Sequence, residues 1–147
     1  VNGLVGSEMC IRDSPKVAFV SHSTFGQPLT SRTKHIKDAV EILKDKKVDF
    51  KFDGDMQPDV ALDEEYKSLY PFSEIVGSAN ILIMPGQHSA AISYKMMKSF
   101  GDSKVIGPLL IGLGLPIEIA PLRSSTSEII NLASIAAYSA DIIDYKK

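Results

Sequence analysis

Short apolar runs alternate with stretches of helical periodicity along the chain. Residues 17–20 and 81–84 are continuous apolar runs of the kind that forms buried strands. Residues 49–52 alternate polar and apolar side chains, which also favours a strand. Two further strands are predicted at residues 106–113 and 117–119, where apolar side chains again dominate.

Helical spacing of apolar side chains fills the intervals between these runs. Ile36, Ala39, Val40 and Leu43 predict a helix that starts at a Ser31 or Thr33 cap and ends near residue 47. Residues 63–70 predict a short helix ended by proline, and a longer helix follows residues 85–89 and stops at Gly101.

The last predicted helix runs from about Ser127 to Asp144 and is rich in small apolar residues, so we expect it to be mostly buried. Ser125 and Glu128 have the spacing of a capping box at its start. Strands that alternate with helices predict an α/β fold, with a mainly parallel sheet and helices on both faces.

Composition limits the classes of function. The 147 residues predict one domain, 44% hydrophobic and 23% charged, which is ordinary for a globular protein. The net charge of -2 shows no excess of basic residues for binding nucleic acid, so nucleic acid is not an expected partner. No apolar run is long enough to span a bilayer, so a membrane is not an expected partner either. With Cys10 as its single cysteine, the chain can form neither an internal disulfide nor a zinc site built from cysteines. This cysteine usage is typical of a reducing compartment, so we expect a cytoplasmic protein.

The first residues do not resemble the rest. Residues 2–14 lack the basic and apolar regions of a signal peptide. Residues 4–13 look like the translation of a sequencing-library adapter, so residues 1–14 are predicted to be a non-native leader, with native sequence from Pro15 to residue 147. The alternative is a disordered leader. Under the first interpretation Cys10 has no function.

Polar side chains follow three of the predicted strands, at residues 21–24, 53–59 and 87–89. The exits of parallel strands meet at one sheet edge, where helix N-termini offer N–H groups to anions. This pattern predicts a phosphate or carboxylate site, and turns and helix caps are the equally weighted alternative. The candidate ligand-binding residues of these three loops are Ser21, Ser23, Thr24, Asp53, Gln57 and His88.

Metal and nucleotide motifs are missing from the sequence. His22, His35 and His88 lack metal-ligand spacing, with His35 expected on a solvated helix face. Residues 53–59 lack the glycine and glutamate positions of a calcium loop. The chain contains neither a Gly-x-Gly-x-x-Gly run after a strand nor a Walker motif, and no catalytic triad is specified. We therefore predict no metal site and no catalytic residue in this chain.

From Pro15 to about Ala140 the chain resembles the C-terminal part of phosphate acetyl/butyryl-transferases. It is more similar to the phosphotransacetylase-like domain that ends bacterial NADP-dependent malic enzymes. The matching segments follow the same order and spacing along the chain: residues 15–21, 53–62, 70–73, 79–85, 94–95, 106–108 and 129–131.

The resemblance implies part of a two-lobed fold similar to isocitrate dehydrogenase, with a cleft for acyl-CoA and phosphate. It adds Arg123, Ser125 and Glu128 to the candidate ligand-binding residues. The transferases carry a Ser-Arg-Gly run where this chain has Pro121-Leu122-Arg123, and an Asp where it has Glu128. Their Asn-x-Gly-Asn run is replaced by residues 88–91. Loss of a fixed donor to developing charge costs on the order of 100-fold in rate, so acetyl transfer is not expected.

The resemblance therefore implies a regulatory and oligomer-forming fragment of a malic enzyme, which oxidatively decarboxylates malate to pyruvate. Acetyl-CoA or a related acyl-CoA would be the effector, and the protein would be a homo-oligomer. NADP and a divalent metal, Mg or Mn, would bind in an N-terminal part upstream of this sequence. Two alternatives stay open: an active phosphate acetyltransferase, in which Arg123 and Ser124 or Ser125 replace the missing pair, and a purely structural dimerisation domain.

Overall fold

The computed structural model describes residues 14–101 and 104–144, and side chains up to residue 141. These residues divide into two compact units, which meet in sequence between Tyr94 and Lys95. The predicted leader, apart from Ser14, lies outside the described residues. The elements, in chain order, are β1 (Lys16–Val20), α2 (Ser31–Asp45), β2 (Lys51–Met56), α3 (Pro58–Leu62), α4 (Glu64–Ser68), β3 (Ile81–Ile83), α5 (Gln87–Phe100) and α6 (Thr126–Asp144).

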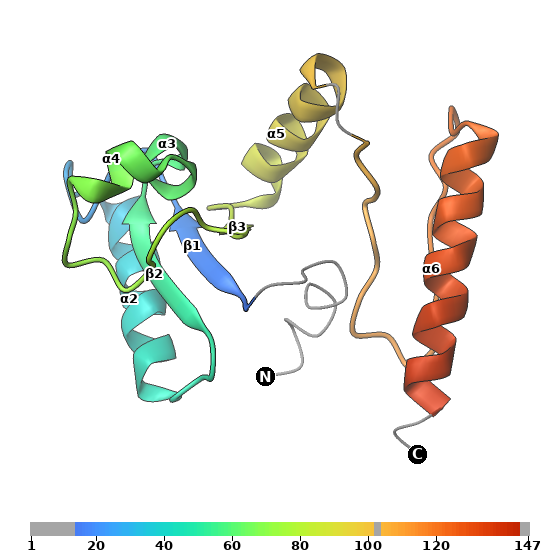
Figure 1. Cartoon of the computed structure of the whole chain (residues 1–147), viewed down its shortest axis with the longest axis horizontal. Coiled ribbons are helices and arrows are strands. Elements are labelled where there is room, and N and C mark those ends of the chain that lie inside the picture. The colour runs from blue at the N-terminus through green and yellow to red at the C-terminus, as the bar shows by residue number, and fades with distance from the viewer. Residues whose placement is uncertain (1–13, 102–103, 145–147) are drawn as a thin grey trace. The chain divides into compact units, whose positions relative to one another are not determined.

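A three-stranded parallel sheet organises the first unit (Figure 1). Its order is β2-β1-β3, so β1 lies in the centre and pairs in parallel with both neighbours. Parallel strands are joined by crossovers, and here the helix α2 connects β1 to β2. The predicted parallel α/β arrangement is confirmed.

Helices cover both faces of this sheet. On one face, Ala18 of β1 and Met56 of β2 form a buried cluster with Val60 and Ala61 of α3. Phe19 points to the other face, because side chains alternate along a strand, and it lines a cleft together with Ile36 of α2. The small α3 and the longer α2 therefore pack on opposite sides of β1.

The helix boundaries follow from local capping. Thr30, one residue before the predicted positions, is the N-cap of α2, and its side chain forms a reciprocal pair with Thr33. Asp63 caps α4 by accepting from the Glu65 backbone N–H at 2.8 Å. The helix α5 ends at Phe100, directly before Gly101, as predicted.

The strand β2 differs from its prediction. It spans Lys51–Met56 rather than residues 49–52, so Asp53 and Asp55 lie in the strand and not in a loop. The composition of residues 53–55 is typical of a turn, yet their backbone pairs with β1, with Ala18 opposite Asp53. Long-range pairing with a neighbouring strand overrides local preference here.

The strands predicted at residues 106–113 and 117–119 are wrong. Residues 104–125 form no strand with any other residue that the structure describes. A strand needs a neighbour for its backbone hydrogen bonds, and the sheet of the first unit contains only β1, β2 and β3. The apolar pattern alone could not reveal that these residues find no partner strand among the described residues.

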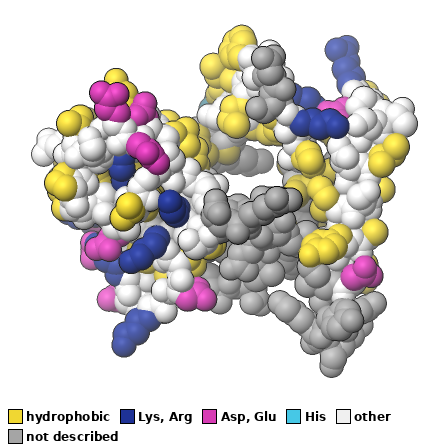
Figure 2. Space-filling view, viewed as in Figure 1, with side chains coloured by type: hydrophobic (Ala, Val, Ile, Leu, Met, Phe, Trp, Pro, Cys, Tyr) yellow, Lys and Arg dark blue, Asp and Glu magenta, His cyan; other side chains and the backbone are white. Residues whose placement is uncertain are grey.

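The expectation of a mostly buried α6 is also wrong. Among its described side chains only Leu132 is buried, while Ile129, Ile130 and Tyr138 are each at least half exposed. Figure 2 shows hydrophobic side chains reaching the surface along this helix. None of the described helices is both long and apolar enough to cross a membrane.

Gly54 allows β1 and β2 to approach closely. A Cβ on Gly54 would lie 2.7 Å from both the Cβ and the carbonyl oxygen of Phe19, and its φ is +151°. The pairing register shifts beside this contact, between Phe19 and Val20. No side chain fits at this position without moving β1.

Gly54→Ala is therefore expected to destabilise the protein by about 1–3 kcal/mol, because the added methyl group clashes with fixed backbone atoms. Urea unfolding monitored by circular dichroism measures the change. Gly86→Ala is the matched control, since nothing lies within 4 Å of its Cβ position. Equal stabilities of the two variants would contradict the close approach.

Candidate functional site

A buried carboxylate connects the ends of β1 and β2. Asp55 is only 2% exposed. Its carboxylate accepts hydrogen bonds from the Ser23 hydroxyl, from the Gly26 backbone N–H at 3.0 Å, and from the Ser21 hydroxyl at 3.4 Å. The Phe25 N–H also donates to the Asp55 carbonyl at 2.6 Å. The loop after β1 is thus tied to β2 through one residue.

Gln57 extends this polar network toward solvent. Its backbone N–H donates to the Thr24 hydroxyl at 3.2 Å, and its side-chain amide donates to the His22 carbonyl at 2.9 Å. Four candidate residues, Ser21, Ser23, Thr24 and Gln57, are therefore brought together. Sequence reasoning missed their central acceptor, Asp55, because it placed residues 53–59 in a loop. The alternation of acidic residues at positions 53 and 55 was the available signal.

Asp53 has a different set of partners. Its carboxylate accepts from the Ser73 hydroxyl at 2.8 Å and from the Glu74 backbone N–H at 2.9 Å. Lys67 is also buried nearby; burial lowers its pKa, and the charge of Asp53 acts in the opposite direction. The Lys67 ammonium donates to the Met56 sulfur at 3.3 Å. Asp53 therefore closes a turn and balances a buried charge, away from the Ser21–Gln57 network.

A cleft of about 860 Å³ opens beside this network in the first unit. Ser21 and His22 from the exit of β1 line it, together with His88 and Ser89 from the first turn of α5, which follows β3. Two of the three predicted strand-exit loops thus meet at one cleft. Pro58 is the only residue of the third loop on its wall.

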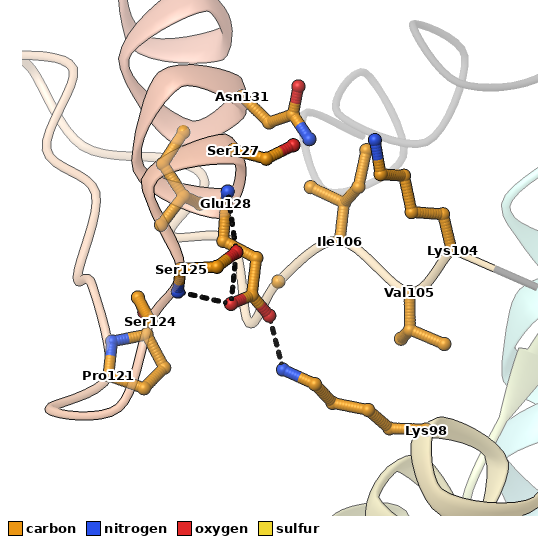
Figure 3. Close-up of a pocket in the computed structure, with 12 residues that line it drawn as sticks. Lys98, Lys104, Val105, Ile106, Pro121, Ser124, Ser125, Ser127, Glu128 and Asn131 are labelled. Atoms are coloured by element: carbon orange, nitrogen blue, oxygen red, sulfur yellow. Dashed lines mark hydrogen bonds and ion pairs between the residues drawn. The ribbon is translucent and has the colours of Figure 1, made fainter.

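The second unit contains a separate pocket of about 340 Å³ at the start of α6. Figure 3 shows Lys104 and Ile106 on one side of this pocket and Ser125, Ser127 and Asn131 on the other. Ser124 also lines the pocket, and its buried hydroxyl oxygen has no hydrogen-bond partner among residues 14–101 and 104–144. Sequence reasoning had considered Ser124 only as a substitute in an active transferase.

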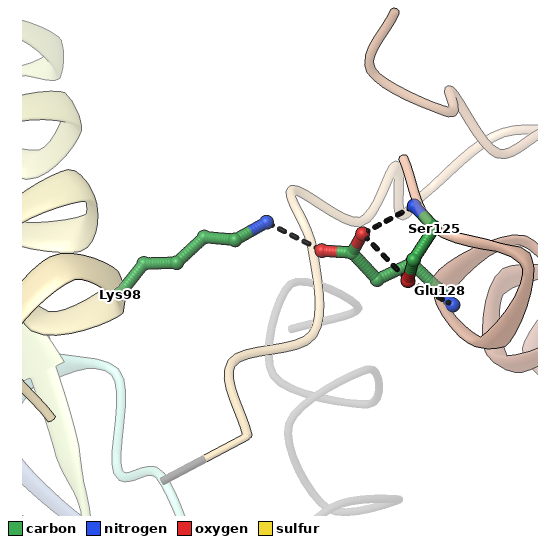
Figure 4. A network of polar contacts seen from close by, with 3 residues as sticks. All are labelled: Lys98, Ser125 and Glu128. Carbon is green, nitrogen blue, oxygen red and sulfur yellow. Dashed lines mark hydrogen bonds and ion pairs between the residues drawn. The ribbon is translucent and has the colours of Figure 1, made fainter. Parts of the chain in front are cut away.

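The capping box predicted at the start of α6 is confirmed. The Ser125 N–H and hydroxyl donate to the Glu128 carboxylate at 2.7 and 3.0 Å, and the Glu128 N–H donates to the Ser125 hydroxyl at 3.3 Å. Figure 4 shows the second oxygen of Glu128 paired with Lys98 of α5, at 2.5 Å. The hydrogen bond from Lys98, followed by those from Ser125, lowers the pKa of Glu128 to about 2.

Arg123 lies outside this pocket. It stands in a turn before α6, where the Ser124 N–H donates to the Pro121 carbonyl at 2.9 Å, and its side chain is exposed. Leu122 beside it is fully exposed. Of the three candidates in the second unit, Ser125 and Glu128 line the pocket and Arg123 does not.

The described residues offer no metal centre. No group of three or more His, Cys, Asp or Glu side chains within residues 14–101 and 104–144 is close enough to hold a metal ion. Hydroxyls, basic side chains and helix N-termini at the two sites are groups that bind anions, and the pocket at α6 also contains the Glu128 carboxylate.

Fold and sites together define an α/β protein whose polar groups gather at the ends of parallel strands and at a helix N-terminus. Residues 7–137 match the family described as phosphate acetyl/butaryl transferase. This match covers most of the chain, which therefore belongs to that family.

Relatives of two kinds share this sequence. The NADP-dependent malic enzyme of Rhizobium meliloti is 48% identical over 126 residues, which is 86% of this chain and 17% of that protein. The phosphate acetyltransferase of Clostridium acetobutylicum is 36% identical over 86% of this chain and 38% of its own length. The chain thus spans less than a fifth of the malic enzyme and corresponds to its phosphotransacetylase-like part.

Solved structures agree with the family. A phosphotransacetylase from Streptococcus pyogenes has a TM-score of 0.83 and 31% identity, over 95% of this chain and 42% of that one. The EutD phosphotransacetylase from Staphylococcus aureus has a TM-score of 0.80 and 27% identity, over 91% and 42% of the two chains. The expected phosphotransacetylase fold class is confirmed.

Asp55→Ala is expected to lower the free energy of unfolding by about 3 kcal/mol, because two hydroxyls and a backbone N–H lose a charged acceptor. Asp55→Asn retains one acceptor oxygen and is expected to lose less. Chemical denaturation measures both variants. Asp38→Asn, in an exposed ion pair with Lys34, is the control and should change stability by less than about 0.5 kcal/mol. A similarly small effect at Asp55 would contradict the role given to its carboxylate.

The Glu128 carboxyl group is expected to titrate near pH 2, below its ordinary value of 4.5. A lowered folded-state pKa stabilises the fold above pH 4.5, and this contribution disappears as the pH falls toward 2. Lys98→Met should shift the titration midpoint upward, as measured by NMR of the carboxyl carbon. Lys95→Met removes a charge from the same helix and should leave the midpoint unchanged. A wild-type midpoint near 4.5 would refute the assignment.

Proposed function

We propose that this chain is the regulatory and oligomer-forming part of an NADP-dependent malic enzyme. In this proposal, acetyl-CoA or a related acyl-CoA binds to the phosphotransacetylase-like fold and inhibits the oxidative decarboxylation of malate to pyruvate. The 48% identity to the Rhizobium meliloti malic enzyme, over 17% of that protein, is the observation that carries the proposal.

The geometry of the second unit supports a binding role without acetyl transfer. A transferase needs donors fixed at the position where negative charge develops. Here Arg123 is exposed in a turn outside the pocket, and the Ser125 donors are used by Glu128. Pro121 and Leu122 offer no side-chain donor.

In this proposal the divalent metal and NADP of the malic enzyme bind elsewhere in the longer protein. The described residues contain no cluster of metal-binding side chains, which is consistent with a site for Mg or Mn outside this chain. NADP would bind there too, since this chain has no Gly-x-Gly-x-x-Gly run. Separate locations for the catalytic site and the effector site are what a regulatory part that acts at a distance requires.

An active phosphate acetyltransferase is the second candidate. It is favoured by the buried hydroxyl of Ser124, which has no hydrogen-bond partner among the residues that the structure describes, and by 36% identity to the Clostridium acetobutylicum phosphate acetyltransferase. A purely structural dimerisation domain is the third, and the exposed apolar side chains of α6 favour it. Acetyl-CoA binding separates the first two candidates from the third.

In the full-length protein that carries this chain, acetyl-CoA is expected to inhibit malate-dependent reduction of NADP. Coupling between distant sites is commonly worth about 5- to 150-fold in affinity. Arg123→Ala should raise the concentration needed for half-inhibition by about tenfold, because it removes an exposed cation that directly precedes the pocket residue Ser124. Lys34→Ala, from an exposed ion pair in the first unit, is the charge-matched control.

An uninhibited wild-type enzyme would eliminate acetyl-CoA sensing. The same preparation, given acetyl-CoA and phosphate, should form no acetyl phosphate above background. Turnover at an ordinary enzymatic rate would instead establish the second candidate.

A further inference from the structure

The Glu128 carboxylate already occupies the groups that could bind an anion at the start of α6. One of its oxygens accepts from the Ser125 backbone N–H at 2.7 Å and from the Ser125 hydroxyl at 3.0 Å. Its other oxygen accepts from the Lys98 ammonium at 2.5 Å. Figure 4 shows the carboxylate between Lys98 on one side and Ser125 on the other. A helix N–H, a hydroxyl and an ammonium are groups that commonly bind phosphate, and here all three bind a side chain of the protein itself.

The position of Glu128 in the helix explains why its side chain reaches these donors. The helix α6 begins at Thr126, so Ser125 precedes its first residue and Glu128 is its third. A glutamate at the third helical position is long enough to fold back to the residue before the helix. The Glu128 N–H donates in return to the Ser125 hydroxyl at 3.3 Å. The carboxylate is therefore held at the helix end from both sides.

This carboxylate stays charged near neutral pH. The hydrogen bond from Lys98, followed by those from Ser125, lowers the pKa of Glu128 to about 2. A second anion at the same place would lose these donors and would also face a like charge, and like charges placed together oppose binding. Glu128 therefore acts against a small anion in two ways.

The remaining lining of this 340 Å³ pocket has a different character. The buried hydroxyl oxygen of Ser124 has no hydrogen-bond partner among the described residues, and Val105 and Ile106 add apolar surface. Lys104 is an exposed cation, and Figure 3 shows it across the pocket from Ser125. An acyl group, which is apolar apart from one carbonyl acceptor, fits these groups. A phosphate would find only Lys104 for its charge.

We propose that Glu128 is a specificity-determining residue, which excludes inorganic phosphate from this pocket and leaves the pocket to the acyl end of an acyl-CoA. The inference rests on the proposed function for its ligand, and it adds how the pocket distinguishes an acyl-CoA from phosphate. An acyl thioester that is bound without phosphate meets no phosphate oxygen to take its acyl group. Its carbon–sulfur bond then stays intact, and the acyl-CoA leaves unchanged. The pocket would in this way sense an acyl-CoA without consuming it.

Titration of the full chain with inorganic phosphate, followed by NMR at the Ser125 backbone amide, tests this exclusion. That amide reports on this pocket, whatever the cleft of the first unit binds. Glu128→Gln is expected to bind phosphate about tenfold more tightly than the wild type, because the opposing charge is gone. Glutamine also forms capping boxes, so this variant should keep the start of α6, which circular dichroism verifies. Glu128→Ala, which in addition releases the Ser125 donors, should bind phosphate at least as tightly.

Asp141→Asn is the matched control. Asp141 is an exposed acidic residue on the same helix that does not line the pocket, so its neutralisation should leave phosphate binding at Ser125 unchanged. A wild type that binds phosphate as tightly as Glu128→Gln would overturn the inference. So would an equal gain in affinity from Asp141→Asn, because the effect would then be one of overall charge.

Inhibition of the full-length protein by acetyl-CoA, measured separately, distinguishes this inference from the proposed function. An uninhibited enzyme whose pocket still excludes phosphate counts against acyl-CoA sensing, while the action of Glu128 against phosphate stands. An inhibited enzyme with equal phosphate binding in the wild type and Glu128→Gln keeps the proposed function and removes the role of Glu128. Formation of acetyl phosphate by the wild type would overturn both, because phosphate must then enter the pocket.

Discussion

The carboxylate of Asp55 is almost entirely removed from water, and a buried charge is stable only when donors surround it. Two serine hydroxyls and the Gly26 N–H supply those donors, and all three come from the loop after β1. The conformation of that loop is therefore set by Asp55 of β2, which follows the three donor residues by 29 to 34 positions in the sequence. The positions of His22 and Thr24, and through them Gln57, depend on the same arrangement.

The close approach of β1 and β2 also helps to place the Asp55 carboxylate beside the loop after β1. Gly54 precedes Asp55 and lies against the backbone of Phe19, whose side chain faces the cleft on the α2 side. A larger residue at position 54 would move β2 away from β1 and carry the Asp55 carboxylate with it. The glycine and the carboxylate thus act together: one permits the approach and the other fixes the loop beyond it.

Features encoded within a few residues could be read from the sequence. Ser125 and Glu128 form their capping box because the interaction spans a single turn, and Asp63 caps α4 for the same reason. Features that depend on distant partners could not be read. The extent of β2 is set by its pairing with β1. Residues 106–113 have no strand partner within the described part of the chain, and composition alone cannot show this. Asp55 was missed as the centre of the network because its donors lie 29 to 34 residues earlier.

The state of Glu128 has a consequence for any anion that arrives at the start of α6. The Glu128 carboxylate already accepts a hydrogen bond from the N–H at the helix N-terminus and forms an ion pair with Lys98. A tethered group of this kind acts at an effective concentration in the millimolar range, without the entropy cost that a free molecule must meet. A phosphate or carboxylate ligand must therefore compete with the Glu128 carboxylate for these donors. The ligand can occupy the site only when the Glu128 side chain moves out of it. Binding of an anion at this site is therefore coupled to the loss of the Ser125–Glu128 capping box in the first turn of α6.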